Sequence, residues 1–375
     1  METTKKYELT DSAIEFNGIT LHRIKAIKNF GNVKSGYLGG WIEKEDNLSQ
    51  IGNAWVDGNA KVCKNAKVFG NAQVYGDAIV SDNAYIYNDA KVYGNAKVYG
   101  YALISNNAEI FENAEVFGGA MVYNNAHIYD NALVYGNAMV GDNAMVFDDA
   151  EVYENTLVCG NAEVYRNAKV FGNARVCGNA EVYGNAILYG DTFVCGNANV
   201  YGNAWVFGKS KVYGNARICD NAKVCGDAKV HNNAMIGDNA RVFINAEVYG
   251  NARIYNDAKV YGNAKVYGYS KVFGNARVHG NAQVYGLAKV FVNAEVYGNA
   301  RIYNNAKVFV NAQVYDNAEI YRNTKVFGNA KVYDNAKVFD YAEICGDARI
   351  CDNAKVCGVA RVCDNAYNTK NNDEE

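Results

Sequence analysis

One feature dominates the sequence: a six-residue repeat that reads Asn-Ala-x-Val-Tyr-Gly, where x is variable. It keeps a single phase from Ala54 to Ala366, with Ala at 48 of 53 positions and Thr or Ser at the other five. The aliphatic position is Val or Ile throughout, except for Leu188. Because β-branched residues at a short fixed period favour strands, the repeat predicts a β-solenoid rather than an ordinary globular domain.

The repeat also predicts which side chains point inward. Side chains alternate along a strand, so Ala and Val of one hexad share a face, while x and Tyr share the other. Since x is mostly Lys, Arg or Glu, burying its face would carry a prohibitive desolvation cost. Ala and Val are therefore expected to face the core. The Gly-Asn, Asp-Asn and Asn-Asp pairs tolerate positive φ, which predicts a sharp corner after each strand.

Exceptions to the repeat recur eighteen residues apart, which sets the number of strands in a coil. At the second corner residue, Tyr101 pairs with Gly119, Tyr269 with Leu287 and Tyr341 with Val359. Three hexads per coil predict an all-β fold, a triangular, single-stranded parallel β-helix of about 17–18 coils over residues 51–367. Residues 1–50 are expected to form an N-terminal cap with a β-hairpin at Asn17-Gly18, and residues 368–375 a polar tail.

A family resemblance follows from these residues. The hexad Val-Tyr-Gly-Asn-Ala-Lys resembles the hexapeptide repeat of left-handed β-helix proteins, and residues 36–43, 47–50 and 52–56 are similar to the opening of bacterial and phage members labelled putative transferases. The resemblance covers nearly the whole chain and implies a left-handed coil. It also implies an acyltransferase that uses an acyl-CoA donor as one function, although this fold hosts enzymes and inert scaffolds alike.

Histidines are the candidate general bases and metal ligands of this sequence. Acyltransferases of that superfamily are expected to hold a general-base histidine near a loop that interrupts the coils, and the unbroken repeat leaves no such loop. His127 occupies an outward x position with Glu109 one coil before it, so His127 oriented by Glu109 is the catalytic candidate, and a solvated surface histidine is the alternative. His231 and His279 replace outward aromatics and are expected to join an aromatic ladder. No spacing predicts a metal site, and no cofactor is expected unless the acyl-CoA alternative holds.

The ten cysteines all occupy the outward aromatic position of the repeat. The N-terminus lacks the apolar segment of a secretory signal, and no apolar run approaches the roughly 18 residues that span a bilayer. We therefore expect a cytoplasmic protein with no membrane span, in which the cysteines are reduced thiols. A disulfide among the stacked Cys159, Cys177 and Cys195 is the alternative.

Apolar x residues gather on one face at eighteen-residue spacing. Five of them on successive coils predict a strip that contacts another copy of the chain, giving a homo-oligomer, or that the N-terminal hairpin covers. Scattered apolar surface is the alternative. The predicted interface residues are Tyr85, Leu103, Met121, Met139, Leu157 and Phe193.

The C-terminal half has a cationic surface. Lys or Arg fills 19 of the 27 x positions between residues 205 and 361, against six of 25 between 55 and 199. One face stacks a basic row beside an aromatic row, which is typical of surfaces that bind single-stranded nucleic acid or another polyanion. The alternative is that lysine stems cover the rings and their charges keep the protein soluble. The residues are Lys271, Lys289, Lys307, Lys325, Phe273, Phe291, Phe309 and Phe327.

The formal charge of −3 indicates that the molecule as a whole is not a general nucleic-acid binder. Taken together, the sequence favours a non-catalytic scaffold or binding protein that associates with itself or with a protein partner. An acyltransferase and a polyanion-binding surface are the alternative functions.

Overall fold

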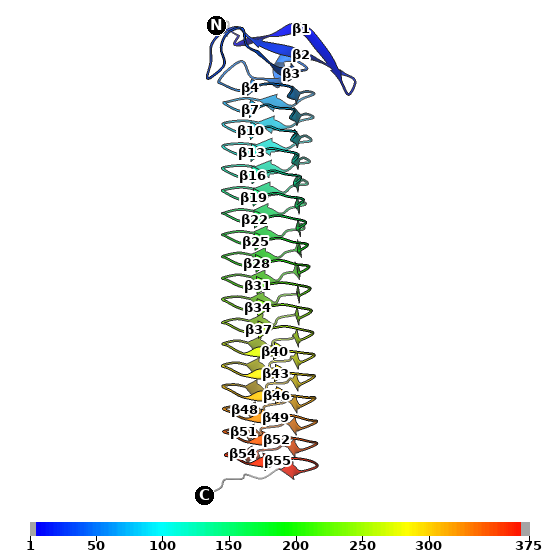
Figure 1. Cartoon of the computed structure of the whole chain (residues 1–375), viewed down its shortest axis with the longest axis vertical. Helices are drawn as coiled ribbons and strands as arrows, with labels where there is room; N and C mark the ends of the chain where they lie inside the picture. Colours follow the sequence, from blue (N-terminus) through cyan, green and yellow to red (C-terminus); the bar gives the residue numbers. More distant parts are fainter. Residues whose placement is uncertain (1–4, 369–375) are drawn as a thin grey trace. The chain divides into compact units, whose positions relative to one another are not determined.

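The computed structural model describes residues 5–368, and the chain divides into two compact units, Met1–Asn185 and Ala186–Glu375. Both units are built from the same coil (Figure 1). From β4 (Trp55–Val56) to β56 (Tyr367–Asn368) a strand begins at every sixth residue, and most strands contain only x and the aliphatic residue that follows. The longer strands are β26 (Ile187–Gly190), β29 (Trp205–Gly208), β40 (Lys271–Phe273), β43 (Lys289–Phe291) and β46 (Lys307–Phe309).

Strands of neighbouring coils pair in parallel, residue for residue, at a separation of eighteen. Leu103 lies opposite Met121 in the first unit, and Lys271 lies opposite Lys289 in the second. These pairings form three parallel sheets from about 18 coils. The predictions of an all-β parallel solenoid and of an eighteen-residue coil are confirmed. Among residues 5–368 the only helix is the short 3₁₀ turn η1 (Glu45–Asn47), and no helix is long and apolar enough to cross a membrane.

The core is built as the alternation predicts. Every inward Val, Ile or Leu from Val56 to Val356 is at most 1 % exposed, and each large aliphatic side chain buried in this way contributes roughly 1.5–3 kcal/mol. Thr and Ser at the alanine position are buried as well. The hydroxyls of Thr156 and Ser270 donate to the carbonyls of Tyr153 and Tyr267, at 2.7 and 2.9 Å, which offsets the cost of burying them.

The corners form a second stacked system, which the hexad pattern alone does not predict. Asn107 donates from Nδ2 to Oδ1 of Asn125 at 3.0 Å, and Asn125 donates in the same way to Asn143. Equivalent amide bonds join second corner residues on many other coils of both units. An aspartate ends a run because a carboxylate has no N–H to donate, as where Asn71 donates to Asp89.

Outward aromatic side chains stack into ladders of nearly parallel, half-buried rings. His231 lies between Tyr213 and Tyr249, with ring centroids 4.6 and 5.0 Å apart. His279 stacks on the rings before and after it at 4.7 and 5.1 Å. The prediction that these two histidines act as flat rings in a ladder is confirmed.

The first 50 residues contain the predicted hairpin. β1 (Tyr7–Phe16) pairs antiparallel with β2 (Ile19–Ala26), and Asn17 and Gly18 both have positive φ in the turn. β3 (Leu38–Ile42) pairs antiparallel with β2 and in parallel with β5 (Lys61–Val62), so the cap continues directly into one sheet of the coils (Figure 1). The predicted tail at 368–375 lies, from residue 369 onward, outside the described residues.

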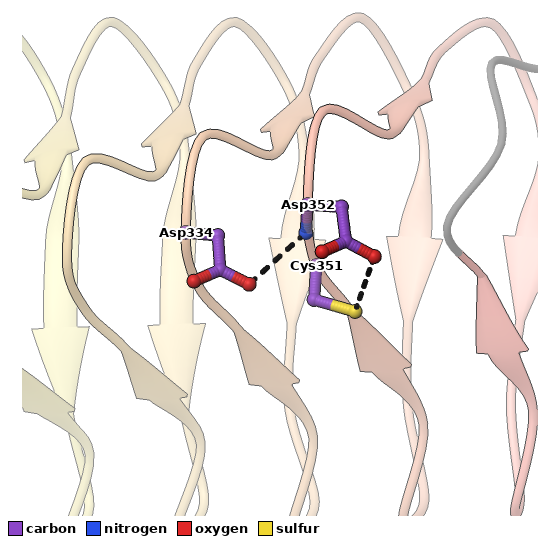
Figure 2. A group of neighbouring side chains, drawn as sticks. All are labelled: Asp334, Cys351 and Asp352. Atoms are coloured by element: carbon purple, nitrogen blue, oxygen red, sulfur yellow. Dashed lines mark hydrogen bonds between the residues drawn. The ribbon is translucent and has the colours of Figure 1, made fainter.

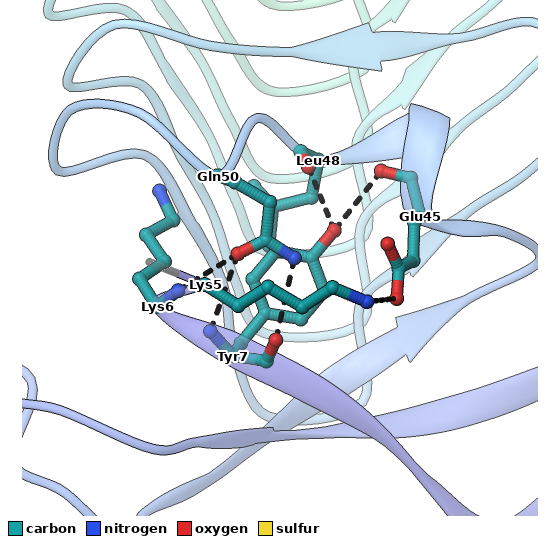
Figure 3. A network of polar contacts seen from close by, with 6 residues as sticks. All are labelled: Lys5, Lys6, Tyr7, Glu45, Leu48 and Gln50. Atoms are coloured by element: carbon teal, nitrogen blue, oxygen red, sulfur yellow. Dashed lines mark hydrogen bonds and ion pairs between the residues drawn. The ribbon is translucent and has the colours of Figure 1, made fainter. Parts of the chain in front are cut away.

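A buried network of hydrogen bonds joins the cap to the first coil (Figure 3). The Lys6 ammonium is buried and donates to the backbone carbonyls of Gly52 and Ala54, at 3.2 and 2.7 Å. Gln50 accepts the Lys6 N–H at 2.8 Å, and the Tyr7 hydroxyl donates to the Leu48 carbonyl at 2.7 Å. Burial, together with the nearby charge of Lys28, lowers the pKa of Lys6 to about 8.

The prediction that all cysteines are reduced is wrong for one pair, because Cys345 and Cys363 form a disulfide. They are eighteen residues apart, and coil stacking brings their Cα atoms to 4.4 Å, within the range that a disulfide spans. The other eight cysteines carry thiols. Cys63 and Cys219 are buried although they occupy the outward aromatic position, because a thiol is much shorter than a ring and stays close to the backbone.

The inward orientation can be tested at neighbouring residues of one strand, β47 (Gln313–Val314). Val314→Asp places a carboxylate in the core without a partner and should destabilise the protein by about 3–5 kcal/mol, measured by thermal unfolding. Gln313→Asp makes the same change on the outward face and should alter the melting temperature little. Equal melting temperatures for the two variants would contradict the assigned orientation.

The tyrosine ladders predict sensitivity to alkali. Burial is the main cause that raises the pKa of Tyr99, Tyr135, Tyr303 and Tyr315 to about 12. The unfolded chain loses these protons near pH 10, whereas the folded chain keeps them, so the stability present below pH 10 should be lost as the pH rises towards 12.

Melting temperatures measured by circular dichroism should therefore fall between pH 9 and pH 11.5. Tyr303→Phe with Tyr315→Phe keeps stacked rings but removes two titrating groups, so the double variant should show a smaller fall. A melting temperature that is constant over this range would disprove the link between the ladders and alkaline stability.

Candidate functional site

Five cations stack on successive strands of one sheet in the second unit. They lie on β37 (Arg253–Ile254), β40, β43, β46 and β49 (Lys325–Val326), each directly opposite the next in the register. The strand spacing places their backbones about 4.8 Å apart. We call this set the cationic row: Arg253, Lys271, Lys289, Lys307 and Lys325.

The charges of the cationic row are largely uncompensated. Within residues 5–368, no ion pair joins Arg253, Lys271, Lys289 or Lys307 to a carboxylate, and only Lys325, at the end of the row, pairs with Glu343 at 2.7 Å. Neighbouring like charges repel one another, so the row lowers the stability of its own unit. The coil holds these charges in place, and an anion bound along the row would relieve their repulsion.

Other lysines of the same unit are placed differently. Lys265 lies 3.4 Å from Glu247, and Lys337 lies 3.6 Å from Glu319. Both lie on a different sheet from the cationic row, on β39 (Lys265–Val266) and β51 (Lys337–Val338). Positive charge without a carboxylate partner is therefore found in particular stacks of residues and not over the whole surface of the second unit.

A groove of about 920 Å³ runs beside the cationic row. Its second wall is formed by second corner residues, three of which are large and apolar or aromatic. Tyr269 is 62 % exposed, Leu287 53 % and Tyr341 65 %. The remaining wall residues are Asn251, Asn305 and Asn323. The groove thus combines a charged wall with a partly apolar one.

In the predicted aromatic row, Phe273, Phe291 and Phe309 end the strands β40, β43 and β46, and Phe327 directly follows β49, but the ring faces of the row are largely occupied. Phe291 stacks on Phe273 at 4.7 Å and on Phe309 at 4.9 Å, and Phe309 stacks on Phe327 at 5.0 Å. Phe291 and Phe309 therefore present only ring edges, on which a nucleic-acid base cannot stack face to face. A ring edge carries partial positive charge, so the edges favour an anion beside the lysines.

A second set of stacked cations was missed in the sequence, where only the row beside the stacked phenylalanines was singled out. It occupies β32 (Lys223–Val224), β35 (Arg241–Val242), β38 (Lys259–Val260) and β41 (Arg277–Val278). Its groove, of about 720 Å³, has a wall made of asparagines and Asp257. We call Lys223, Arg241, Lys259 and Arg277 the second cationic row.

The predicted apolar strip is assembled in the first unit. Tyr85, Leu103, Met121, Met139 and Leu157 lie opposite one another on five successive strands, β9 (Tyr85–Ile86) to β21 (Leu157–Val158). Tyr85 is exposed and the other four are half-buried. The exposed Tyr101 lies at the corner just before Leu103. Phe193 belongs to the second unit, where its register partner is Lys211.

The register places Glu109 one coil before His127, as predicted, and Met145 one coil after it. Glu109, however, accepts hydrogen bonds from Lys91 at 2.7 Å and from the Tyr93 hydroxyl at 2.9 Å. Partial burial alone would raise the pKa of Glu109, but the hydrogen bonds from Lys91 and Tyr93 lower it overall. Within the described residues Glu109 makes no hydrogen bond to His127, although the two side chains are register neighbours and His127 contributes to the lowered pKa of Glu109. A catalytic role for His127 with Glu109 therefore stays a prediction.

One further group brings possible metal ligands together. Ligand atoms of Asp334, Cys351 and Asp352 lie within 4.8 Å of one another (Figure 2). The Asp334 carboxylate accepts the Asp352 N–H at 3.1 Å, and the Cys351 thiol lies 3.7 Å from the Asp352 carboxylate. Coil stacking makes neighbours of residues 334 and 352, which a search for short ligand spacings does not find. These internal hydrogen bonds account for the arrangement without an ion.

Comparison with known proteins supports the solenoid. The YdcK beta solenoid repeat family matches residues 72–88, 126–142 and 174–190. None of the curated proteins compared with the chain matches it. The chain is therefore similar, over these three segments, to a family of β-solenoid repeat proteins. The resemblance to hexapeptide-repeat transferases stays a prediction, because a fold does not by itself carry an activity.

Proposed function

We propose that this chain is a non-catalytic solenoid scaffold whose second unit binds a linear polyanion along the cationic row. The observation that carries the proposal is the stack from Arg253 to Lys307, in which four successive cations have no carboxylate partner among the described residues. A surface that served only solubility would gain from mixed charges, as on the sheet where Lys265 meets Glu247.

The geometry favours a long partner over a compact one. Each coil presents one cation, so a partner gains by extending along the row and displacing counterions at every coil. The groove beside the row is open and continuous over the same coils. Binding should accordingly weaken steeply as the salt concentration rises.

Retention on immobilised heparin tests this proposal. Lys289→Gln with Lys307→Gln should lower the salt concentration needed for elution, and should reduce the slope of log affinity against log salt by about two. Lys265→Gln with Lys337→Gln removes the same net charge from paired lysines and serves as the control. Equal loss of retention in the two double variants would indicate general charge rather than a site.

A second candidate function, self-association, rests on the apolar strip of the first unit. Its five x residues lie on successive coils without a charge among them. Exposed apolar surface of this length typically marks a contact with another protein, and the flat face of one strip can pack on the same strip of a second copy. We therefore infer that the scaffold forms a homo-oligomer through this strip.

Light scattering tests the homo-oligomer. Met121→Glu with Met139→Glu places two charges in the strip and should lower the molar mass to that of one chain, because the carboxylates would have to be desolvated in the contact. Met145→Glu adds a carboxylate on another sheet of the same unit and should leave the mass unchanged. A wild-type protein that is already monomeric would rule out this contact.

A further inference from the structure

The asparagine ladder is broken beside the cationic row. Asn233 donates to Asn251 at 3.3 Å, and Asn305 donates to Asn323 at 3.2 Å, but Tyr269 and Leu287 occupy the two positions between these pairs. Neither residue can continue the amide ladder, and both expose apolar surface to water. Compared with asparagine at the same positions, Tyr269 and Leu287 lose the ladder hydrogen bonds and also expose apolar surface to water. The fold alone does not explain why these two residues stand there.

The second cationic row provides an internal comparison. Its corner column keeps polar residues that form two runs of the ladder: Asn221 donates to Asn239 at 3.2 Å and Asn239 to Asp257 at 3.1 Å, and after the aspartate Asn275 donates to Asn293 at 3.1 Å. Stacked cations on this solenoid therefore do not require an apolar wall beside them. The exposed Tyr269 and Leu287 belong to one groove, and they point to something that this groove binds.

We propose that the groove binds an acidic polypeptide segment, an amphipathic helix whose carboxylates pair with the cationic row and whose apolar side chains pack on Tyr269 and Leu287. The inference rests on the proposed function and specifies the polyanion. Charge complementarity selects the acidic face, and the exposed leucine and tyrosine select the apolar one.

Helix geometry suits the spacing of the groove. One helical turn rises about 5.4 Å, close to the roughly 4.8 Å between coils, so carboxylates three or four residues apart meet successive cations. From Arg253 to Lys325 the row covers four coil spacings, roughly 19 Å, which matches about 13 residues of helix. Apolar residues adjacent to the acidic face would then lie against the opposite wall.

Nucleic acid and sulfated polysaccharide fit the same groove less well. The rings of Phe291 and Phe309 are covered by their neighbours, so no row of bases can stack there. Tyr269 and Tyr341 are exposed but four coils apart, about 19 Å, too far for adjacent bases. Neither polymer carries aliphatic side chains that would cover Leu287.

Binding of synthetic peptides to the full chain tests the proposal. One peptide of about 14 residues carries glutamates and leucines on adjoining helix faces, and a second has glutamine at every leucine position but the same charge. The first should bind at least about tenfold more tightly, measured by fluorescence anisotropy, because only it covers the apolar wall. Equal affinities, or tighter binding of a single-stranded oligonucleotide, would overturn the proposal.

A variant that restores asparagine at the two ladder positions serves as the control for the apolar contact. Tyr269→Asn with Leu287→Asn replaces the apolar wall by the ladder residue and leaves every charge in place, so the melting temperature should stay the same or rise. The leucine peptide should then bind no better than the glutamine peptide, while heparin retention is unchanged. An unaltered preference for the leucine peptide in this variant would place the apolar contact elsewhere and refute the assignment.

Two further results separate this inference from the proposed function. Lys289→Gln with Lys307→Gln should weaken both peptides and heparin, whereas Arg241→Gln with Lys259→Gln, in the second cationic row, should leave the leucine peptide bound. If the wild-type chain binds neither heparin nor either peptide, the polyanion function itself fails. If it binds all three with no preference for leucine, only the acidic amphipathic partner is disproved.

Discussion

Parallel backbone hydrogen bonds between residues eighteen apart are the interaction on which the rest of this structure depends. They place each side chain directly against its equivalent in the next coil, so that one residue type repeated at this interval becomes a column. A favourable contact is thereby multiplied, as in the asparagine ladders and the stacked rings. An unfavourable one is multiplied as well, as in the cationic row. No single coil is stable alone, because its core residues are covered only by its neighbours.

Columns restrict which residues can change independently. An asparagine in a ladder both donates and accepts, so replacing one affects the residues above and below it, and paired departures disturb fewer ladder contacts than two separate ones. Two of the three paired departures lie beside the distinctive surfaces: Tyr101 and Gly119 beside the apolar strip, and Tyr269 and Leu287 beside the cationic row. Of the third pair, Tyr341 lines the groove of the cationic row and Val359 does not. A broken ladder thus identifies coils whose outer surface has a requirement that the fold does not impose.

The fold could be predicted almost completely from sequence because its period is visible in every hexad and because burial decides which face turns inward. The register also follows from the period, so His127 was correctly placed beside Glu109. The period does not determine with which of several neighbours a long side chain forms its hydrogen bond or ion pair. Glu109 has coil neighbours on both sides and bonds to Lys91 rather than to His127. The same holds for the disulfide of Cys345 and Cys363, and for Lys325, which pairs with Glu343, whereas the other four cations of the row have no carboxylate partner among the described residues.

The stacking of equivalent residues in columns also affects which functions the outer surface of the solenoid can support. Catalysis requires different groups to converge on one point, with a nucleophile, a base and an orienting partner within hydrogen-bond distance. A column instead repeats similar groups along a line, and residues of successive hexads lie on different sheets. His127 illustrates the consequence, since the carboxylate stacked next to it is held by Lys91 and Tyr93. Regular coils therefore favour recognition of an extended partner, with affinity gained in small equal steps along the solenoid. Specificity then has to come from the few positions where a column departs from its repeat, and we propose that Tyr269 and Leu287 are such positions.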